Sequence, residues 1–274
     1  MFHSWILVTF VDVPHSCKFV SHSWKFVLFV FLFVAACAPQ PLTVTPAPVT
    51  LRVVVSDACE RPVGALALAY HRQKPWVAIE TDVLNDHFAL ERLQAGAADG
   101  AALIWTDEAP LWTHPFASDA LAVVVHPAVP VEGLTLAELR EVLRGRVGEW
   151  PDGTPIQVVS REEGAGTHSL VKAAVLGQWD LTLTARVVPD DASMLDLVAQ
   201  TPGAIGYVPL SRVNGGVRVL ALEGRSPAPT ADYPLSYACR WAARAEPTGV
   251  LREWMQWTVG PQGQAVVDQS LRPQ

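Results

Sequence analysis

From Leu51 onward, short apolar runs that are typical of strands alternate with segments of helical periodicity. This alternation is characteristic of folds in which helices cover a sheet that contains parallel strands. The chain is therefore predicted to be an α/β protein. The expected strands are 51–55, 76–80, 101–105, 120–125, 156–160, 204–208 and 217–222. The expected helices are 63–71, 88–93, 134–143, 170–176 and 193–199, with the closing helices within 246–268.

Two of these helices carry recognisable N-terminal signals. Thr135 is placed to cap the helix that ends at Leu143, and Glu138, three residues later, completes a capping box. Asp190 and Asp191 precede the helix 193–199 and are predicted to cap it.

The N-terminal segment has the layout of a bacterial signal peptide. Lys18 and Lys25 precede an apolar run, 26–36, that ends at Cys37. A helix of this length rises only about 16 Å, roughly half the hydrocarbon core of a membrane. The four residues 34–37 resemble a lipobox, so residues 1–37 are predicted to be a signal peptide with a lipid on Cys37. Ordinary cleavage and retention as an anchor are the alternatives.

Residues 38–50 are rich in proline and threonine, which predicts a semi-extended tether rather than a packed segment. The chain as a whole has a net charge of −7. A surface of this sign does not attract nucleic acid, so no nucleic-acid partner is expected. An anion would have to be held by local donors against the overall field.

Cys59 and Cys239 are the two cysteines outside the N-terminal 37 residues. Outside the cytoplasm they are able to form one disulfide. Two unpaired, buried small residues are the alternative, because the sequence does not place their Cα atoms within bonding distance.

The segment 160–167 links a predicted strand to a predicted helix and has the composition of an anion-binding loop. Its glycines allow backbone N–H groups to converge at the start of the helix, and Arg161 offers a planar fork that matches two oxygens. The Thr167 hydroxyl is a further donor. A simple glycine turn, with Arg161 paired to Glu162 or Glu163, is the alternative.

The sequence of this loop, Ser160-Arg-Glu-Glu-Gly-Ala-Gly-Thr167, resembles the Ser-Arg-x-x-Gly-Ser-Gly-Thr loop of phosphate-binding proteins in the periplasmic binding-protein superfamily. Other segments are similar to that family in the same order along the chain, from Leu51 to the C-terminus. They are 119–127, 134–150, Gly203-Ala-Ile-Gly-Tyr-Val208, Tyr233-Pro-Leu-Ser236 and Gly260-Pro-Gln-Gly-Gln264.

This resemblance implies a two-lobed, type II binding-protein fold with a ligand cleft between the lobes. The expected lobes are 51–125 plus 232–274, and 126–231. It also implies an extracytoplasmic solute-binding lipoprotein, on the outer face of the bacterial cytoplasmic membrane, which binds phosphate or a related oxyanion and docks on an ABC permease. The expected ligand-binding residues are Ser56, Asp57, Ala58, Arg161, Gly164, Ala165, Gly166 and Thr167.

The chain departs from the family pattern at several hydroxyl positions. The family has a Gly-Ser-(Ser/Thr)-Thr stretch where this chain has 56–59, a polar pair where it has Leu103 and Ile104, and a serine where it has Ala165. Each lost hydrogen bond to a charged ligand is worth about 1.5–3 kcal/mol. A surface sensor or interaction module with little affinity for solute is therefore the alternative function.

Other chemistry is not indicated by the sequence. Asp57 is either a ligand contact or the N-cap of the helix near Pro62, and Trp105 and Trp112 either pack or line a cleft. Cys59 and Ser169 lack the surroundings of a nucleophile, so no enzyme is expected. The body's histidines lack ligand spacing, so neither metal nor cofactor is expected: His71, His87, His114, His126 and His168.

Overall fold

The computed structural model describes residues 47–105 and 110–272. The predicted signal peptide, Cys37 and most of the predicted tether lie outside these ranges. Within them, no helix is long and apolar enough to cross a membrane.

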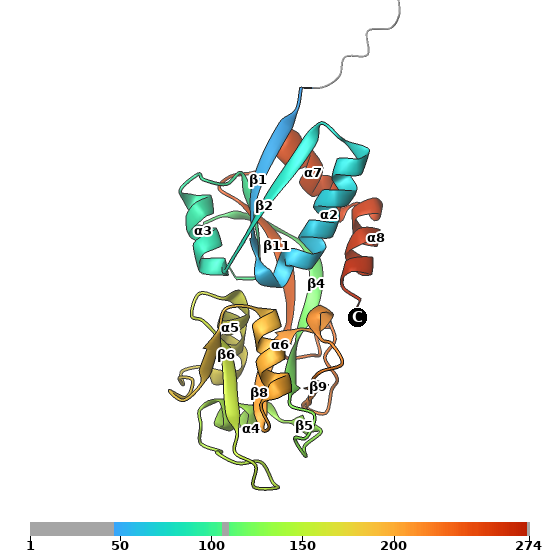
Figure 1. The fold of residues 1–274 in the computed structure, drawn as a ribbon. Helices are drawn as coiled ribbons and strands as arrows, with labels where there is room; N and C mark the ends of the chain where they lie inside the picture. The colour runs from blue at the N-terminus through green and yellow to red at the C-terminus, as the bar shows by residue number, and fades with distance from the viewer. Residues whose placement is uncertain (1–46, 106–109, 273–274) are drawn as a thin grey trace, which may run out of the picture. The chain divides into compact units, whose positions relative to one another are not determined.

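The described residues form the mixed α/β fold that the sequence predicts (Figure 1). The strands are β1 (Val49–Ser56), β2 (Val77–Leu84), β3 (Gly100–Leu103), β4 (Trp112–Val125), β5 (Gly133–Leu134), β6 (Gln157–Arg161), β7 (Arg186–Val188), β8 (Ala204–Pro209), β9 (Arg218–Val219), β10 (Ala221–Leu222) and β11 (Ser236–Ala243). The helices are η1 (Asp57–Cys59), α2 (Glu60–Gln73), α3 (Asp86–Gln94), α4 (Leu136–Leu143), α5 (Gly166–Val171), η2 (Lys172–Leu176), α6 (Asp191–Gln200), η3 (Leu210–Arg212), α7 (Gly249–Val259) and α8 (Pro261–Ser270).

One long strand, β4, links two sets of strands in a sheet of order β2-β1-β3-β11-β4-β8-β6-β7. β1 is parallel to both β2 and β3, and β6 is parallel to β7 and β8. β4 pairs antiparallel with β11 along residues 112–120 and with β8 along residues 121–125. Figure 1 shows α2, α3, α7 and α8 around β1 and β2, and α4, α5 and α6 around β6 and β8.

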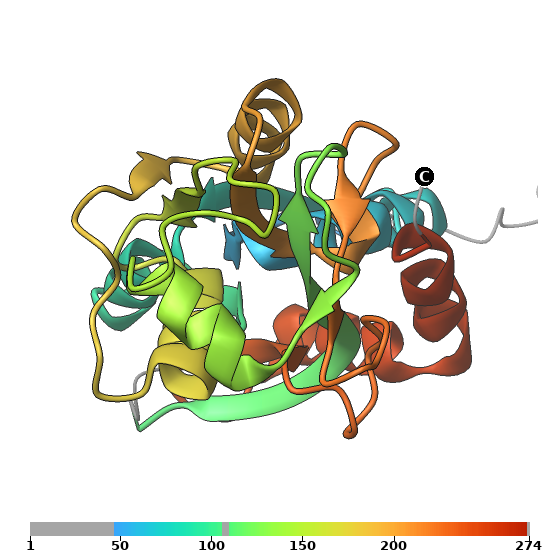
Figure 2. The same cartoon turned by 90° about the horizontal axis from the view of Figure 1, so that it is seen from below.

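The strands are buried on both faces, which explains their continuous apolar runs. In β8, Ile205 and Tyr207 pack with α4 and η2, whereas Ala204 and Val208 pack with α6 on the other face. Figure 2 shows α4 and α6 on opposite sides of these strands. In β1, Val53 packs toward α2 and Val54 toward α3 by the same alternation.

The core residues fall into two groups along the chain. One group comes from residues 51–117 and 239–267, and the other from residues 120–235. The change from one group to the other occurs within β4, between Ala117 and Ala120.

Both predicted N-terminal signals are confirmed. The Thr135 hydroxyl accepts a hydrogen bond from the Glu138 backbone N–H, and the Glu138 carboxylate accepts one from the Thr135 N–H, which is the complete capping box. The Asp190 carboxylate accepts a hydrogen bond from the Ser193 N–H, although the helix begins at Asp191, two residues earlier than predicted.

Several predicted boundaries are wrong. β4 begins at Trp112 rather than at residue 120, so that it includes Pro115. This proline lies opposite a register shift between Cys239 and Arg240 in β11. Irregularities of this kind tolerate a proline inside a sheet. The strands β5, β7 and β11 are absent from the prediction. The predicted strand 217–222 is split into β9 and β10, and α5 begins at Gly166 rather than at residue 170.

Candidate functional site

Residues at or just beyond the C-terminal ends of four strands, β1, β2, β3 and β6, meet at the buried carboxylate of Asp86. This residue is the first of α3, two residues beyond the end of β2, and only 3 % of it is exposed. One carboxylate oxygen accepts hydrogen bonds from the backbone N–H groups of Ile104 and Trp105, at 2.9 and 3.0 Å. The other accepts from the Ser56 hydroxyl at 2.6 Å and from the Gly166 N–H at 2.9 Å.

We call these four donors the oxyanion cradle: the Ser56 hydroxyl and the N–H groups of Ile104, Trp105 and Gly166. They come from the end of β1, the segment after β3 and the start of α5. Their arrangement gives two donors to each of two oxygens, which matches the needs of an ionised carboxylate or another oxyanion.

The neighbouring segments add contacts between the same parts of the chain. The His87 N–H donates to the Gly164 carbonyl at 3.0 Å, and the Asn85 side-chain amide donates to Glu162 at 3.4 Å. Gly164 has a φ of +96°, a conformation that favours glycine. The segments 85–87 and 162–166 are therefore held together at several points.

Gly166 is required because Asp86 comes very close to it. A Cβ at this position would lie 2.4 Å from Asp86 Oδ2 and 2.4 Å from Ile104 Cγ1. We expect Gly166→Ala to lower the free energy of unfolding by about 1–3 kcal/mol, because the added methyl group forces these atoms apart. Urea denaturation is the measurement. Gly148→Ala is the control, because a Cβ there meets no atom within 4 Å, and equal stability of the two variants would contradict the close packing at Gly166.

Arg161 lies at the end of β6 and is buried, with 2 % of its side chain exposed. Its guanidinium forms ion pairs with Asp57, with Asp191 at 3.4 Å and with Glu162 at 3.2 Å. It also donates to the carbonyls of Pro189 and Val188, at 2.6 and 3.2 Å. All of its nitrogens thus have protein partners, and an incoming oxyanion would have to share the guanidinium with these carboxylates.

The structure brings together the two predicted segments of the site, 56–58 and the loop 160–167. Asp57 binds Arg161 directly, and one of its oxygens also accepts a hydrogen bond from the Ala58 N–H at 2.8 Å. The alternative that Asp57 caps the helix near Pro62 is wrong, because α2 begins at Glu60 without a side-chain cap. Glu162 pairs with Arg161, as the turn alternative for the loop 160–167 expects.

The remaining predicted loop residues are buried and take different roles. Ala165 lies at the N-cap position of α5 and offers no side-chain cap. The Thr167 hydroxyl is buried, with 1 % of the residue exposed, and it has no hydrogen-bond partner among the described residues. A buried hydroxyl without a partner is uncommon and calls for an explanation.

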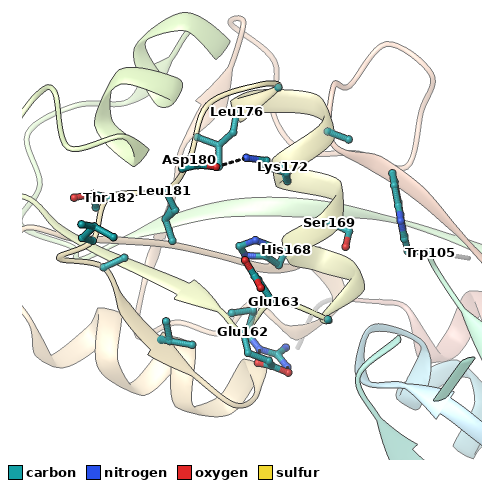
Figure 3. A pocket seen from close by; sticks show the side chains of 17 residues that line it. Trp105, Glu162, Glu163, His168, Ser169, Lys172, Leu176, Asp180, Leu181 and Thr182 are labelled. Carbon is teal, nitrogen blue, oxygen red and sulfur yellow. Dashed lines mark hydrogen bonds and ion pairs between the residues drawn. The ribbon is translucent and has the colours of Figure 1, made fainter. Parts of the chain in front are cut away.

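One cavity is lined by Arg161 and a second by its partners Asp57 and Asp191, and both are lined by more Asp and Glu than Arg and Lys side chains. One has a volume of about 770 Å³ and lies along α5 and η2, where His168, Ser169 and Lys172 face it (Figure 3). Trp105 lines this cavity, whereas Trp112 packs beside His114 away from it. The other, of about 400 Å³, is lined by Asp57, Glu60, Arg61, Val83, Asp190, Asp191, Ala192, Leu195 and Arg212.

Burial changes the proton affinity of three groups near the site. It raises the pKa of Asp86 to about 6, although hydrogen bonds from Ser56, Trp105 and Ile104 act the other way. Burial and the charge of Asp57 raise the pKa of Asp191 to about 7, against the charge of Arg161. Burial lowers the pKa of His168. At neutral pH, Asp86 is therefore mostly ionised within the cradle.

The raised pKa values of Asp86 and Asp191 predict that the protein is more stable in mild acid than in mild base. A carboxyl whose pKa is raised on folding stabilises the fold at low pH, and this contribution is lost as the pH rises through the folded-state pKa. For Asp86 and Asp191 together, the difference between about pH 5 and about pH 8 is up to about 4 kcal/mol. The lowered pKa of His168 acts in the opposite direction, because its contribution to stability is lost as the pH falls. Thermal unfolding at the two pH values measures the effect, and Asp86→Asn should reduce it. A higher midpoint at about pH 8 would contradict the prediction.

Cys59 and Cys239 are joined by a disulfide, with their Cα atoms 5.8 Å apart. This is the bonded alternative of the two that the sequence leaves open. The bond fixes η1, which begins at Asp57, to β11. No group of three or more His, Cys, Asp or Glu side chains within 47–105 and 110–272 is arranged to hold a metal ion.

Sequence reasoning missed Asp86 and the pairing of Asp191 with Arg161. Ser56 directly follows the predicted strand 51–55, whereas Asp86 lies six residues beyond the predicted strand 76–80, because β2 continues to Leu84. The carboxyl ends of parallel strands lie at one edge of a sheet, so a polar residue there is a usable signal only where the end of the strand is placed correctly. Asp191 was read only as a capping residue, and its contact with Arg161 bridges 30 residues along the chain.

Comparison with known proteins identifies the family. The protein is 25 % identical over 245 residues to the phosphate-binding protein PstS of Bacillus subtilis, covering 82 % of this chain and 80 % of that protein. A solved structure from Clostridium perfringens, described as a candidate phosphate ABC transporter substrate-binding protein with bound phosphate, has a TM-score of 0.76. It is 22 % identical, and the match covers 81 % of this chain and 98 % of that one. An ABC-type phosphate transport receptor from Vibrio cholerae has a TM-score of 0.69 at 22 % identity, and the match covers 80 % of this chain and 98 % of that one.

The model of the PBP superfamily domain matches residues 43–262, so the chain belongs to this superfamily of periplasmic binding proteins and has its fold.

Proposed function

We propose that this protein is the extracytoplasmic solute-binding component of an ABC importer and that its solute is phosphate or a related oxyanion. The observation that carries the proposal is the oxyanion cradle, in which four donors from three segments converge on one pair of carboxylate oxygens. The phosphate-binding relatives in Bacillus subtilis and in the solved structures support the choice of solute.

The residues of the loop 160–167 and of the segment after β1 belong to this proposed site. Ser56 and Gly166 supply donors in the cradle, and Asp57 and Ala58 follow Ser56 directly. The unpartnered Thr167 hydroxyl is a further donor that a solute would satisfy. Gly164 and Ala165 shape the loop, and Arg161 supplies positive charge beside it.

The wider organisation is also part of the proposal. We assign residues 51–125 plus 232–274 to one lobe and 126–231 to the other, with the solute between them. A lipid on Cys37 would anchor the protein to the outer face of the bacterial cytoplasmic membrane, and residues 38–50 would act as the tether. The importer's permease would be the protein partner. A binding protein of this kind is not an enzyme.

Calorimetric titration of the full-length chain with phosphate, sulfate and arsenate tests the proposal. We expect saturable binding of phosphate or arsenate with one site per chain. Thr167→Val removes a buried hydroxyl that has no partner among the described residues, and it should weaken this binding at least about tenfold, since hydrogen bonds to charged groups are worth about 1.5–3 kcal/mol. Ser118→Ala, on the exposed face of β4, is the matched control. No binding of any oxyanion by the folded chain would refute the proposed solute class.

A surface sensor or interaction module without transport is the second candidate function. Two observations favour it: Arg161 is already paired with three carboxylates, and the cavities lined by Arg161 and by its partners Asp57 and Asp191 have more Asp and Glu than Arg and Lys side chains. This candidate predicts a folded chain that does not bind phosphate, sulfate or arsenate, and the same titration therefore separates the two functions.

A further inference from the structure

We propose that Asp86 is an internal ligand of the oxyanion cradle, so that a free oxyanion binds only by displacing the Asp86 carboxylate. The inference rests on the proposed function, because it assumes that the cradle is the place where solute binds. The inference goes beyond that function in naming Asp86 as a residue that sets the affinity for solute.

The contacts of Asp86 are those expected of a bound anion. Both of its carboxylate oxygens accept two hydrogen bonds, with donor–acceptor distances of 2.6–3.0 Å. The side chain is almost completely buried. No arginine or lysine is among its partners in the described part of the chain, so backbone N–H groups and one hydroxyl provide all of its hydrogen bonds.

The occupied cradle leaves no donor for a second anion. The Ser56 hydroxyl has one proton, which it gives to Asp86, and each of the three backbone N–H groups has one hydrogen that is already used. A second anion beside the ionised Asp86 would also be repelled, and Asp57 adds to the negative charge nearby. Solute and Asp86 are therefore mutually exclusive in this site.

The surroundings allow the carboxylate to leave. Asp86 is the first residue of α3, and Asn85, which lies between it and the end of β2, caps the helix. A change at Asp86 thus leaves the cap intact. The 770 Å³ cavity is lined by Trp105, which is itself a cradle donor, and by Gly164, two residues before the donor Gly166, and it offers solute a way toward the cradle.

Asp86→Ala tests the inference, because it empties the cradle without adding bulk. In the full-length chain at neutral pH, we expect Asp86→Ala to bind phosphate at least about tenfold more tightly than the wild type, since competition with an internal anion is removed. Formate, which matches the deleted carboxylate, should raise the thermal midpoint of Asp86→Ala and leave that of the wild type unchanged.

The controls separate an internal ligand from a purely structural residue. Asp82→Ala removes an exposed carboxylate from β2, and it should behave as the wild type toward both anions. If Asp86→Ala is too unstable to study, Asp86→Ser keeps a small polar group, and the same tightening is expected. If Asp86 had only a structural role, both variants would be less stable than the wild type, and neither formate nor phosphate would restore their stability.

Three results are distinguishable. Tighter phosphate binding by Asp86→Ala or Asp86→Ser than by the wild type supports the inference. Equal or weaker binding by these variants, with clear binding by the wild type, overturns the inference and leaves the proposed function intact. Absence of oxyanion binding by the wild type and by the folded variants overturns both.

Discussion

Arg161→Ala is expected to lower the free energy of unfolding by about 3–5 kcal/mol, because it leaves buried carboxylates without their counter-charge. The side chains of Asp57 and Asp191 are only 14 % and 7 % exposed, and both face this guanidinium. Chemical denaturation of the full-length chain, followed by tryptophan fluorescence, measures the change. Loss of phosphate binding in this variant alone would therefore not identify Arg161 as a ligand contact.

A double variant and an exposed pair serve as controls for Arg161. Asp57→Asn in the Arg161→Ala background should recover part of the lost stability, since it removes one of the unpaired charges. Arg52→Ala breaks an exposed ion pair with Asp99 and should cost no more than about 1 kcal/mol. An Arg161→Ala protein as stable as Arg52→Ala would contradict the importance of the buried ion pairs.

Removal of the disulfide is expected to cost about 2–5 kcal/mol, because the bond closes a very long loop in the unfolded chain. Cys59 and Cys239 are 180 residues apart in sequence. The change is Cys59→Ala together with Cys239→Ala, and the measurement is denaturation of the oxidised wild type and the double variant under the same conditions.

Reduced wild-type protein is the control for the disulfide. With a reducing agent present, its stability should approach that of the double variant, since both then lack the cross-link. Peptide mapping without reduction should recover a linked pair of peptides that contain residues 59 and 239. Equal stability of oxidised wild type and double variant, or two free thiols at these positions, would contradict the prediction.

Much of the fold follows from local sequence patterns. The apolar runs of β1, β2 and β8 and the capping box at Thr135 predict elements that the structure contains. β11 was missed because its identity as a strand depends on pairing with β3 and β4, which lie more than 100 residues away in sequence. The start of β4 was missed because Pro115 argues against a strand unless the partner's irregular register is known.

The site was less predictable than the fold. The composition of the loop 160–167 and its resemblance to a known family indicated an anion site, and Ser56, Asp57 and Gly166 do lie near its centre. Which anion fills that place depends on contacts across the fold: Asp86 and Gly166 are 80 residues apart, and Asp57 and Arg161 are 104 apart. No local pattern records such pairings.

The most direct test of the account is to locate an oxyanion by its own scattering. Crystals of the wild type and of Asp86→Ala, grown at neutral pH with the same concentration of arsenate, would be compared in anomalous difference maps at the arsenic edge. We expect a peak in Asp86→Ala within hydrogen-bonding distance of the Ser56 hydroxyl and the Gly166 N–H, and a weaker peak there in the wild type, because Asp86 competes for the same donors. An empty cradle in Asp86→Ala, or an equally strong peak in the wild type with Asp86 still bound to its four donors, would contradict the account.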